Sequence, residues 1–179
     1  MPSLYEALAP GWPALPAVVR RLHQPGTARG SFDVDRGPGL LARCVAALFG
    51  LPPAGRAVVV ELEVSERDGV QSWARRIGGV ALLSTQYRGG PARLFERLGT
   101  VECDIDVTAA DGALTFATRG ARLVFGPVRI PLPRPLAPRI HARAVAAGDD
   151  VSVAVEIGSP MTGRLLRYAG LVRPQGTAS

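Results

Sequence analysis

From residue 56 onward, hydrophobic and polar residues alternate with a period of two, a pattern typical of β-strands with one buried face. The clearest stretch is 101–107, in which acidic residues separate four apolar ones: Val101, Cys103, Ile105 and Val107. Turns such as Asp68-Gly69 predict hairpins between neighbouring strands. The predicted strands are 27–35, 56–65, 70–77, 80–88, 101–107, 113–125, 140–145, 151–157 and 165–172, while 92–98 fits a helix or a strand equally.

Three segments within the first 50 residues carry helix signals instead. Ser3 and Glu6 have the spacing of a capping box, which predicts a short helix there. Apolar residues of 13–23 recur at helical spacing, and His23 would end this helix, where histidine commonly interacts with free carbonyls. The segment 38–49 is the strongest helix prediction, and we expect its apolar stripe to be buried against a sheet face or a barrel mouth. The stripe consists of Leu40, Leu41, Cys44, Val45, Leu48 and Phe49.

The long run 113–125 is the strand around which the pattern is organised. Predicted strands lie upstream and downstream of it, so we expect it near the middle of one antiparallel sheet. Prolines alternate with other residues in the segment that follows, which favours extended polyproline geometry. We expect its proline-rich part, 131–138, to close one end of a barrel.

These elements predict an α+β protein that is mainly antiparallel β. Eight or nine short strands with hairpin turns indicate a curled sheet or a closed, lipocalin-like β-barrel with N-terminal helices. Closure is favoured because it removes exposed sheet edges. The alternative is a helix-grip fold, which normally ends in a long C-terminal helix, and 160–169 is a weak candidate for one. A single domain 1–179 is predicted, with a helical segment 1–26, a barrel-like part 27–173 that includes helix 38–49, and a tail 174–179.

The chain is basic, with a formal net charge of +6, but its charge pattern argues against a nucleic-acid partner. All 21 basic residues are arginines, a bias typical of a GC-rich genome, and they are scattered rather than clustered. Aromatic residues make up 6%, too few for a base-stacking surface. No run approaches the roughly 18 apolar residues of a membrane span, and the amino terminus lacks the pattern of a secretory signal. We therefore expect a cytoplasmic protein without a transmembrane segment.

No motif in the chain indicates a cofactor, a metal or a nucleophile. The glycines form neither a dinucleotide-binding fingerprint nor a phosphate-binding loop, and no serine lies in a nucleophile elbow. His23 and His141 lack metal-ligand spacing to each other and to Cys44 and Cys103, which we interpret as buried small hydrophobes. Acidic residues of the strands are interpreted as a solvated outer surface rather than paired catalytic carboxylates. No cofactor and no metal site is predicted, and catalytic residues stay unassigned.

Five segments together resemble an uncharacterised bacterial family, domain of unknown function 4166. They are LLARCVAALFGLPPAG (40–55), SWARRIGG (72–79), ARLFERLG (92–99), VRIPLPRPLAPRI (128–140) and MTGRLLRYAGLVRP (161–174). The resemblance extends from Leu4 to about Pro174. It implies neither an activity nor catalytic residues, because none is assigned to that family.

The predicted barrel interior is the best candidate for a functional site. Small and medium apolar residues line it, and few large aromatics are available to fill it, which favours a cavity over a packed core. The main hypothesis is therefore a protein that binds a hydrophobic small molecule of the lipid, polyketide or isoprenoid type. Amphipathic or interior residues form the predicted ligand-binding set: Trp73, Gln86, Tyr87, Cys103 and Tyr168.

Two alternatives stay open. The first is a cofactor-independent cyclase or isomerase that acts on such a substrate in a biosynthetic pathway, which needs no sharp catalytic motif because the cavity preorganises the substrate. The second is a protein-interaction module in which the proline-rich segment 131–138 serves as a ligand for an adaptor.

Overall fold

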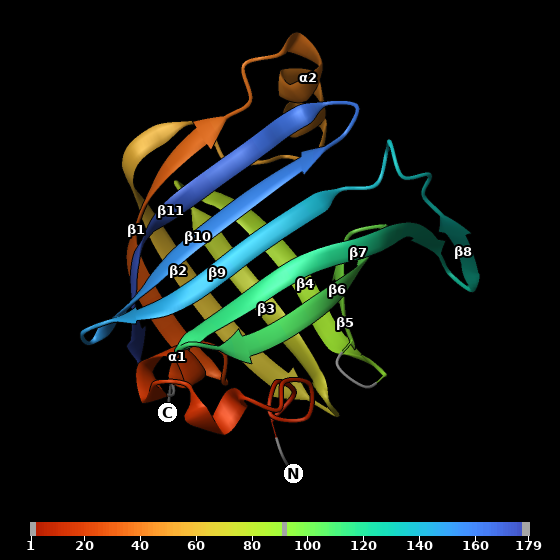
Figure 1. Cartoon of the computed structure of the whole chain (residues 1–179). Helices are drawn as coiled ribbons and strands as arrows, with labels where there is room; N and C mark the ends of the chain where they lie inside the picture. The colour runs from red at the N-terminus through yellow and green to blue at the C-terminus, as the bar shows by residue number, and fades with distance from the viewer. Residues whose placement is uncertain (1–2, 91–92, 177–179) are drawn as a thin grey trace.

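The chain folds as a β-barrel, shown in Figure 1 as a computed structural model that describes residues 3–90 and 93–176. Its strands are β1 (Gly26–Arg36), β2 (Gly55–Arg67), β3 (Val70–Ile77), β4 (Val80–Gly90), β5 (Arg93–Leu98), β6 (Val101–Ala110), β7 (Ala113–Phe125), β8 (Val128–Pro131), β9 (Arg139–Ala147), β10 (Asp150–Ser159) and β11 (Gly163–Gln175). Their order in the sheet is β6-β5-β4-β3-β2-β1-β11-β10-β9-β7-β8, and all pairs are antiparallel. Pairing of β6 with β7 closes the first ten of these into a ring, and β8 extends β7 beyond it.

The closed barrel expected from the sequence is confirmed. The undecided segment 92–98 contributes strand β5, and β8 arises inside the proline-rich stretch, so the number of strands exceeds the eight or nine predicted. The helix-grip alternative is wrong, because residues 163–175 form strand β11 and not a helix. Strand β11 also occupies the start of the expected tail 174–179, of which residues 177–179 lie outside the described part.

The segment before β1 covers one end of the barrel. It contains the 3₁₀ helix η1 (Trp12–Ala14) and the helix α1 (Ala17–Leu22), which lie across the strand ends in Figure 1. The capping-box bonds between Ser3 and Glu6 form, at 3.3 Å each, but they stabilise a turn rather than a regular helix. Within residues 3–90 and 93–176, no helix has the length and apolarity needed to cross a membrane.

Strand alternation sorts the side chains into an inner and an outer set. In β6, Cys103, Ile105 and Val107 are buried inside, as their period of two predicts. On the outside, Asp104 and Asp106 pair with arginines, so most of the acidic face is the polar outer surface predicted for it. The exception is Glu102, which is 2% exposed although it points outward.

Two glycines on neighbouring strands permit the curvature of the β1–β11 pair. Gly30 and Gly170 lie where the strands approach so closely that a side chain at either position would collide with the backbone of the other strand. Such glycines mark bends in strongly coiled strands. They explain how two long strands follow the tight wall of the barrel.

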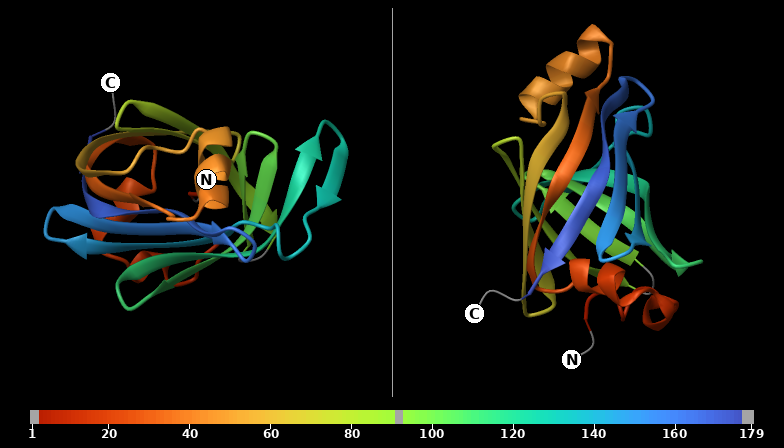
Figure 2. Two further views of the ribbon diagram at one scale, coloured as in Figure 1. Left: turned by 90° about the horizontal axis from the view of Figure 1, so that it is seen from above. Right: turned by 90° about the vertical axis from the view of Figure 1, so that its left-hand side faces the viewer.

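Helix α2 (Leu40–Leu48) lies at the other end of the barrel, the mouth, above β1 and β11 (Figure 2). The prediction that its large apolar stripe is buried is wrong. Ala42 and Ala46 face the barrel, whereas Leu40 and Leu48 are 76% and 82% exposed. The physical reason is side-chain size. The small alanine side chains allow the helix to pack closely on β11, so the opposite face, which carries the larger apolar side chains, is exposed to solvent.

The proline-rich segment 131–138 does not close an end of the barrel as expected. It lies at the rim of the mouth, where the carbonyl of Pro135 accepts a hydrogen bond of 3.2 Å from the amide of Met161 in the β10–β11 turn. The closed end is instead formed by residues 4–24, which pack into the core through Tyr5, Trp12 and Leu22.

Candidate functional site

Three polar side chains from adjacent strands meet on the inner wall of the barrel. Arg75 of β3 donates a hydrogen bond of 2.8 Å to Ser84 Oγ of β4 and another of 3.1 Å to Glu96 Oε1 of β5. Ser84 in turn donates to the same Glu96 oxygen at 2.7 Å. We call these three residues the inner polar cluster.

The inner polar cluster is a charge-neutral unit. Ions removed from bulk water need a partner, and here Arg75 has Glu96. Burial is the largest single influence on the pKa of Arg75 and acts to lower it, but the carboxylate of Glu96 and the phenols of Tyr168 and Tyr5 together raise it by more, so the pKa is raised and the guanidinium stays charged. Arg75 also lies 4.9 Å from the ring centroid of Trp73, a cation–π contact on the same face of β3.

Side chains beside this cluster are not fully buried although they face the inside of the barrel. The side chains of Arg75 and Glu96 are 21% and 18% exposed although both point inward. Other inward residues at mid-height are only half-buried, namely Leu62, Leu82, Phe116, Val153 and Tyr168. These inward side chains therefore leave part of the barrel interior unfilled at mid-height.

The Tyr168 hydroxyl is a polar group facing this space. The ring of Tyr168 stacks on Phe32 with centroids 5.0 Å apart. Burial raises the pKa of Tyr168, while the charges of Arg75 and Glu96 act on it in opposite directions, which places the phenol within electrostatic reach of the inner polar cluster. Among the described residues, its hydroxyl has no hydrogen-bond partner, so it is available to a ligand.

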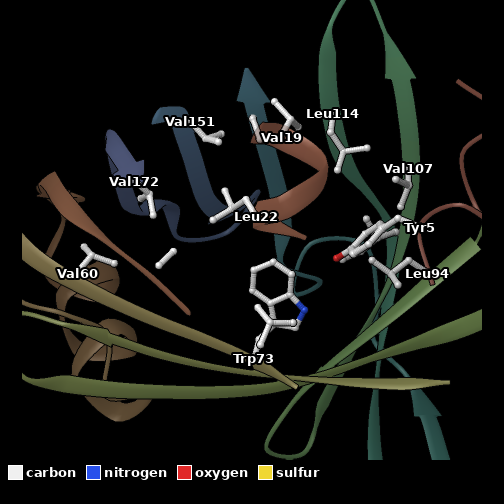
Figure 3. Close-up of a cluster of buried hydrophobic side chains, with 14 of the residues drawn as sticks. Tyr5, Val19, Leu22, Val60, Trp73, Leu94, Val107, Leu114, Val151 and Val172 are labelled. Carbon is white, nitrogen blue, oxygen red and sulfur yellow. The ribbon is translucent and has the colours of Figure 1, made fainter. Parts of the chain in front are cut away.

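Aromatic rings form the floor of the interior at the closed end. Tyr5, Trp12, Trp73 and Phe116 surround His23, with ring centroids 5.2 to 6.5 Å from the imidazole. Figure 3 shows Tyr5 and Trp73 pointing into the interior among buried aliphatic side chains. We call these five residues the aromatic floor.

Two glutamines bind the aromatic floor to the strands. The Tyr5 hydroxyl donates to Gln86 Oε1, and Trp73 Nε1 donates to Gln71 Oε1 at 3.2 Å. Both glutamines are at most 4% exposed, so each amide is committed to these contacts. The floor is thus a satisfied, rigid base for the space above it.

The structure brings four of the five predicted ligand-binding residues to the inner wall. Trp73 and Gln86 belong to the floor region, Cys103 lies on β6 facing inward, and Tyr168 lies on β11. Tyr87 is the correction, because it follows Gln86 directly in β4 and therefore points outward.

On the outer face, Tyr87 covers a buried carboxylate. Its hydroxyl donates to Glu102, which also pairs with Arg122. The guanidinium of Arg122 lies 4.4 Å from the ring centroid of Phe95. This arrangement explains the low exposure of Glu102 and leaves Tyr87 with a structural role.

The inner polar cluster itself was not predicted from the sequence. Arg75 was available as a signal, because an arginine at an inward position between Trp73 and Ile77 breaks the alternation of β3. Glu96 gave no such signal, since its segment was undecided between helix and strand. Within the described residues, no group of three or more His, Cys, Asp or Glu side chains is placed to hold a metal ion.

The two cysteines differ in environment, which gives a testable prediction. Cys44 is exposed on α2, contrary to expectation, while burial raises the pKa of Cys103 to about 12. Relative to an ordinary thiol, this lowers the thiolate fraction of Cys103 on the order of a thousandfold. We expect one fast thiol in the folded protein with a disulfide reagent, and a second only after unfolding. A Cys44→Ser variant should lose the fast phase; two fast thiols in the native protein would contradict the burial of Cys103.

Fold and site together define a closed antiparallel barrel with one covered end, partly exposed inward side chains and a neutral polar cluster on one wall. The chain belongs to the family described as a domain of unknown function (DUF4166), which matches residues 15–172. No curated protein matches it. Among solved structures, it is similar to an SAHS protein from Ramazzottius varieornatus, with 10% identity, a TM-score of 0.44 and coverage of 84% of this chain and 94% of that one.

Proposed function

We propose that the barrel binds a lipophilic small molecule, of the lipid, polyketide or isoprenoid type, with its polar end at the inner polar cluster. The single observation that carries this proposal is the partial exposure of inward-facing Arg75 and Glu96 beside half-buried apolar side chains. Apolar walls with a few convergent polar groups are typical of ligand pockets. Burial of the apolar part of the ligand would supply most of the affinity, at roughly 25 cal/mol per Å².

The cluster favours an uncharged polar end on the ligand. Glu96 already neutralises Arg75, so an anionic head group would meet no uncompensated positive charge. A hydroxyl group, by contrast, can accept a hydrogen bond from Tyr168 and donate one to the remaining lone pair of Ser84, and a carbonyl group can accept from Tyr168, in each case without a net charge being buried. A long-chain alcohol is therefore expected to bind more tightly than the carboxylate of the same chain length.

The two ends of the barrel differ, which determines the end at which a ligand would enter. Residues 4–24 cover one end with buried side chains, so a ligand would enter past α2 and settle with its distal part toward the mouth. The small side chains on β9, which lies opposite β3 in the strand order, leave room across the barrel from Arg75: they are Ala142, Ala144 and Ala146.

The proposal is tested by titrating delipidated protein with a long-chain alcohol while the quenching of tryptophan fluorescence is followed. Ala142→Trp should weaken binding at least about tenfold, because it fills the interior. The matched control is Ala154→Trp, the same change at an outward, exposed position on the adjacent strand β10, and it should bind as the unchanged protein does. Equal binding by both variants would place the ligand outside the barrel.

Native mass spectrometry of protein from its own host, followed by lipid extraction, identifies the natural ligand. A co-purified lipophile that is released unchanged supports a binding protein. Conversion of that compound on incubation would instead support the cyclase or isomerase alternative, with the inner polar cluster as the reacting site. A protein without bound lipophile that also fails to bind the alcohol would contradict both.

A further inference from the structure

Helix α2 presents its large apolar side chains to solvent. Leu40 and Leu48 are 76% and 82% exposed, whereas Ala42 and Ala46 on the opposite face are 1% and 0% exposed. A surface helix normally turns its larger apolar residues toward the core. Here the larger apolar residues point away from the core, which suggests that this face contacts something other than the barrel itself.

Exposed apolar side chains continue from α2 around the mouth. Met161 in the β10–β11 turn is 54% exposed, and Leu136 in the 132–138 turn is 46% exposed. These elements are joined, since α2 packs on β11 and the amide of Met161 bonds to Pro135. We call this set the apolar rim: Leu40, Leu41, Leu48, Phe49, Leu136 and Met161.

Charge is distributed unequally between the two ends of the barrel. The loops at the mouth are 37–54, 78–79, 99–100, 132–138 and 160–162, and they contain no aspartate or glutamate. They do contain the exposed arginines Arg43 and Arg134, and the adjoining strand ends carry Arg139 and Arg164. The carboxylates at these strand ends, Asp33 and Asp35 of β1, are paired with Arg56. At the opposite end, the β2–β3, β6–β7 and β9–β10 turns carry an acidic residue: Asp68, Asp111 and Asp149.

We propose that the apolar rim docks on a membrane surface that contains anionic phospholipids. Leucine and phenylalanine side chains would enter the boundary between head groups and acyl chains, while the arginines meet lipid phosphates. The projecting helix at one end of the barrel, seen in Figure 2, can make this contact without a change in the strands.

Charge complementarity favours a membrane over a second copy of the chain. In a two-fold dimer the same patch meets itself, so Arg43 and Arg164 of one protomer would face arginines of its partner without a carboxylate in the mouth loops. An anionic lipid surface neutralises the same arginines. Fluid lipid also adapts to side chains that project from a helix and two turns.

This inference goes beyond the proposed function, because it concerns the outer end of α2 and not the interior. It gives the mouth of the barrel direct access to lipophilic molecules dissolved in a bilayer. The experiment uses delipidated protein without added ligand, so a failure of vesicle binding leaves the proposed interior site untouched, and the reverse also holds.

The test is co-sedimentation with phosphatidylcholine vesicles that contain or lack phosphatidylglycerol. We expect strong binding only with phosphatidylglycerol, weakened by salt. The double variant Leu40→Ser/Leu48→Ser should lower the partition coefficient about tenfold or more. Its matched control is Val59→Ser/Leu83→Ser, which alters two barrel-side residues that are each 65% exposed and should bind unchanged.

The arginine contribution is tested separately. Arg43→Gln should lower binding to phosphatidylglycerol vesicles about fivefold, whereas Arg67→Gln, at the far end of β2, should have no effect. A polarity-sensitive fluorophore on Cys44, which lies on the outward stripe of α2, should shift to shorter wavelength when vesicles are added.

Three results would overturn the inference. They are no vesicle binding at low salt, equal binding by the rim variant and its control, and conversion of a dimer to a monomer by Leu40→Ser/Leu48→Ser without a change in vesicle binding. The last result, read by light scattering, would identify the apolar rim as a self-association face.

Discussion

Replacing Tyr5 by alanine is expected to lower the free energy of unfolding by about 4 kcal/mol. Tyr5 is 0% exposed, and its ring stacks on Trp12 with centroids 5.5 Å apart and meets Phe116 edge-on at 5.9 Å. The change creates a cavity in the aromatic floor. It also removes the donor that satisfies Gln86, which is buried beneath it.

Urea denaturation followed by tryptophan fluorescence measures this effect directly. The chain has two tryptophans, and both Trp12 and Trp73 are buried in the aromatic floor, so the signal reports the region that is changed. Tyr5→Phe is the control: it keeps the ring and removes the hydroxyl, with an expected loss of about 1–2 kcal/mol. A loss below about 1 kcal/mol for Tyr5→Ala would show that residues 4–24 do not pack into the barrel.

The result also bears on function, since the floor defines the depth of the interior. Without the Tyr5 ring, the closed end gains space continuous with the region beneath Trp73. Because the apolar chain of a bound alcohol extends toward the mouth, this space at the closed end should admit a bulkier polar end rather than a longer chain, provided that the variant is folded under the conditions used. This links the stability of the N-terminal segment to ligand size.

Much of the fold could be predicted because strand period fixes which side chains face inward. The alternation in β6 correctly assigned Cys103, Ile105 and Val107 to the core. The same rule shows why Tyr87 fails as a ligand-binding residue, since its neighbour Gln86 occupies the inward position. For these strands, the alternation in the sequence and the inward or outward direction of the side chains agree.

The orientation of α2 could not be predicted from its own sequence. Its large apolar residues form a stripe, but the face that packs on β1 and β11 is the one with the small side chains of Ala42 and Ala46. Similarly, the six residues of β5 contain apolar positions that fit both periods. Only pairing with β4 and β6 fixes that segment as a strand and places Glu96 beside Arg75.

For His23, the sequence predicted the contact with a helix carbonyl but not the burial of the imidazole among aromatic rings. Its Nδ1 lies 2.9 Å from the carbonyl oxygen of Val19 at the end of α1, as expected for a histidine that ends a helix. Since a carbonyl only accepts, Nδ1 carries the hydrogen. The aromatic rings that enclose the imidazole come from β3, β7 and the N-terminal turn, and only the folded chain brings them together.

Acid is expected to destabilise the barrel through His23. Burial lowers the pKa of His23 from 6.5 to about 4; the hydrogen bond to Val19 opposes this shift and the charge of Arg75 adds to it. Because the pKa is lower in the folded state, the unfolded chain takes up a proton first as the pH falls. The free energy of unfolding is therefore unaffected by His23 above pH 6.5 and decreases between pH 6.5 and about 4, by about 3 kcal/mol in total.

Urea denaturation at a series of pH values isolates this contribution. His23→Gln removes the titrating group, so the decrease in unfolding free energy between pH 7 and pH 4 should be smaller by about 3 kcal/mol than in the unchanged protein. His141→Gln is the matched control, because it makes the same change at an exposed position on β9, outside the aromatic floor. Identical pH profiles for the unchanged protein and His23→Gln would mean that the imidazole is solvated. The aromatic floor would then be open to water, and the lower limit of the proposed binding space would lie at the inner polar cluster instead.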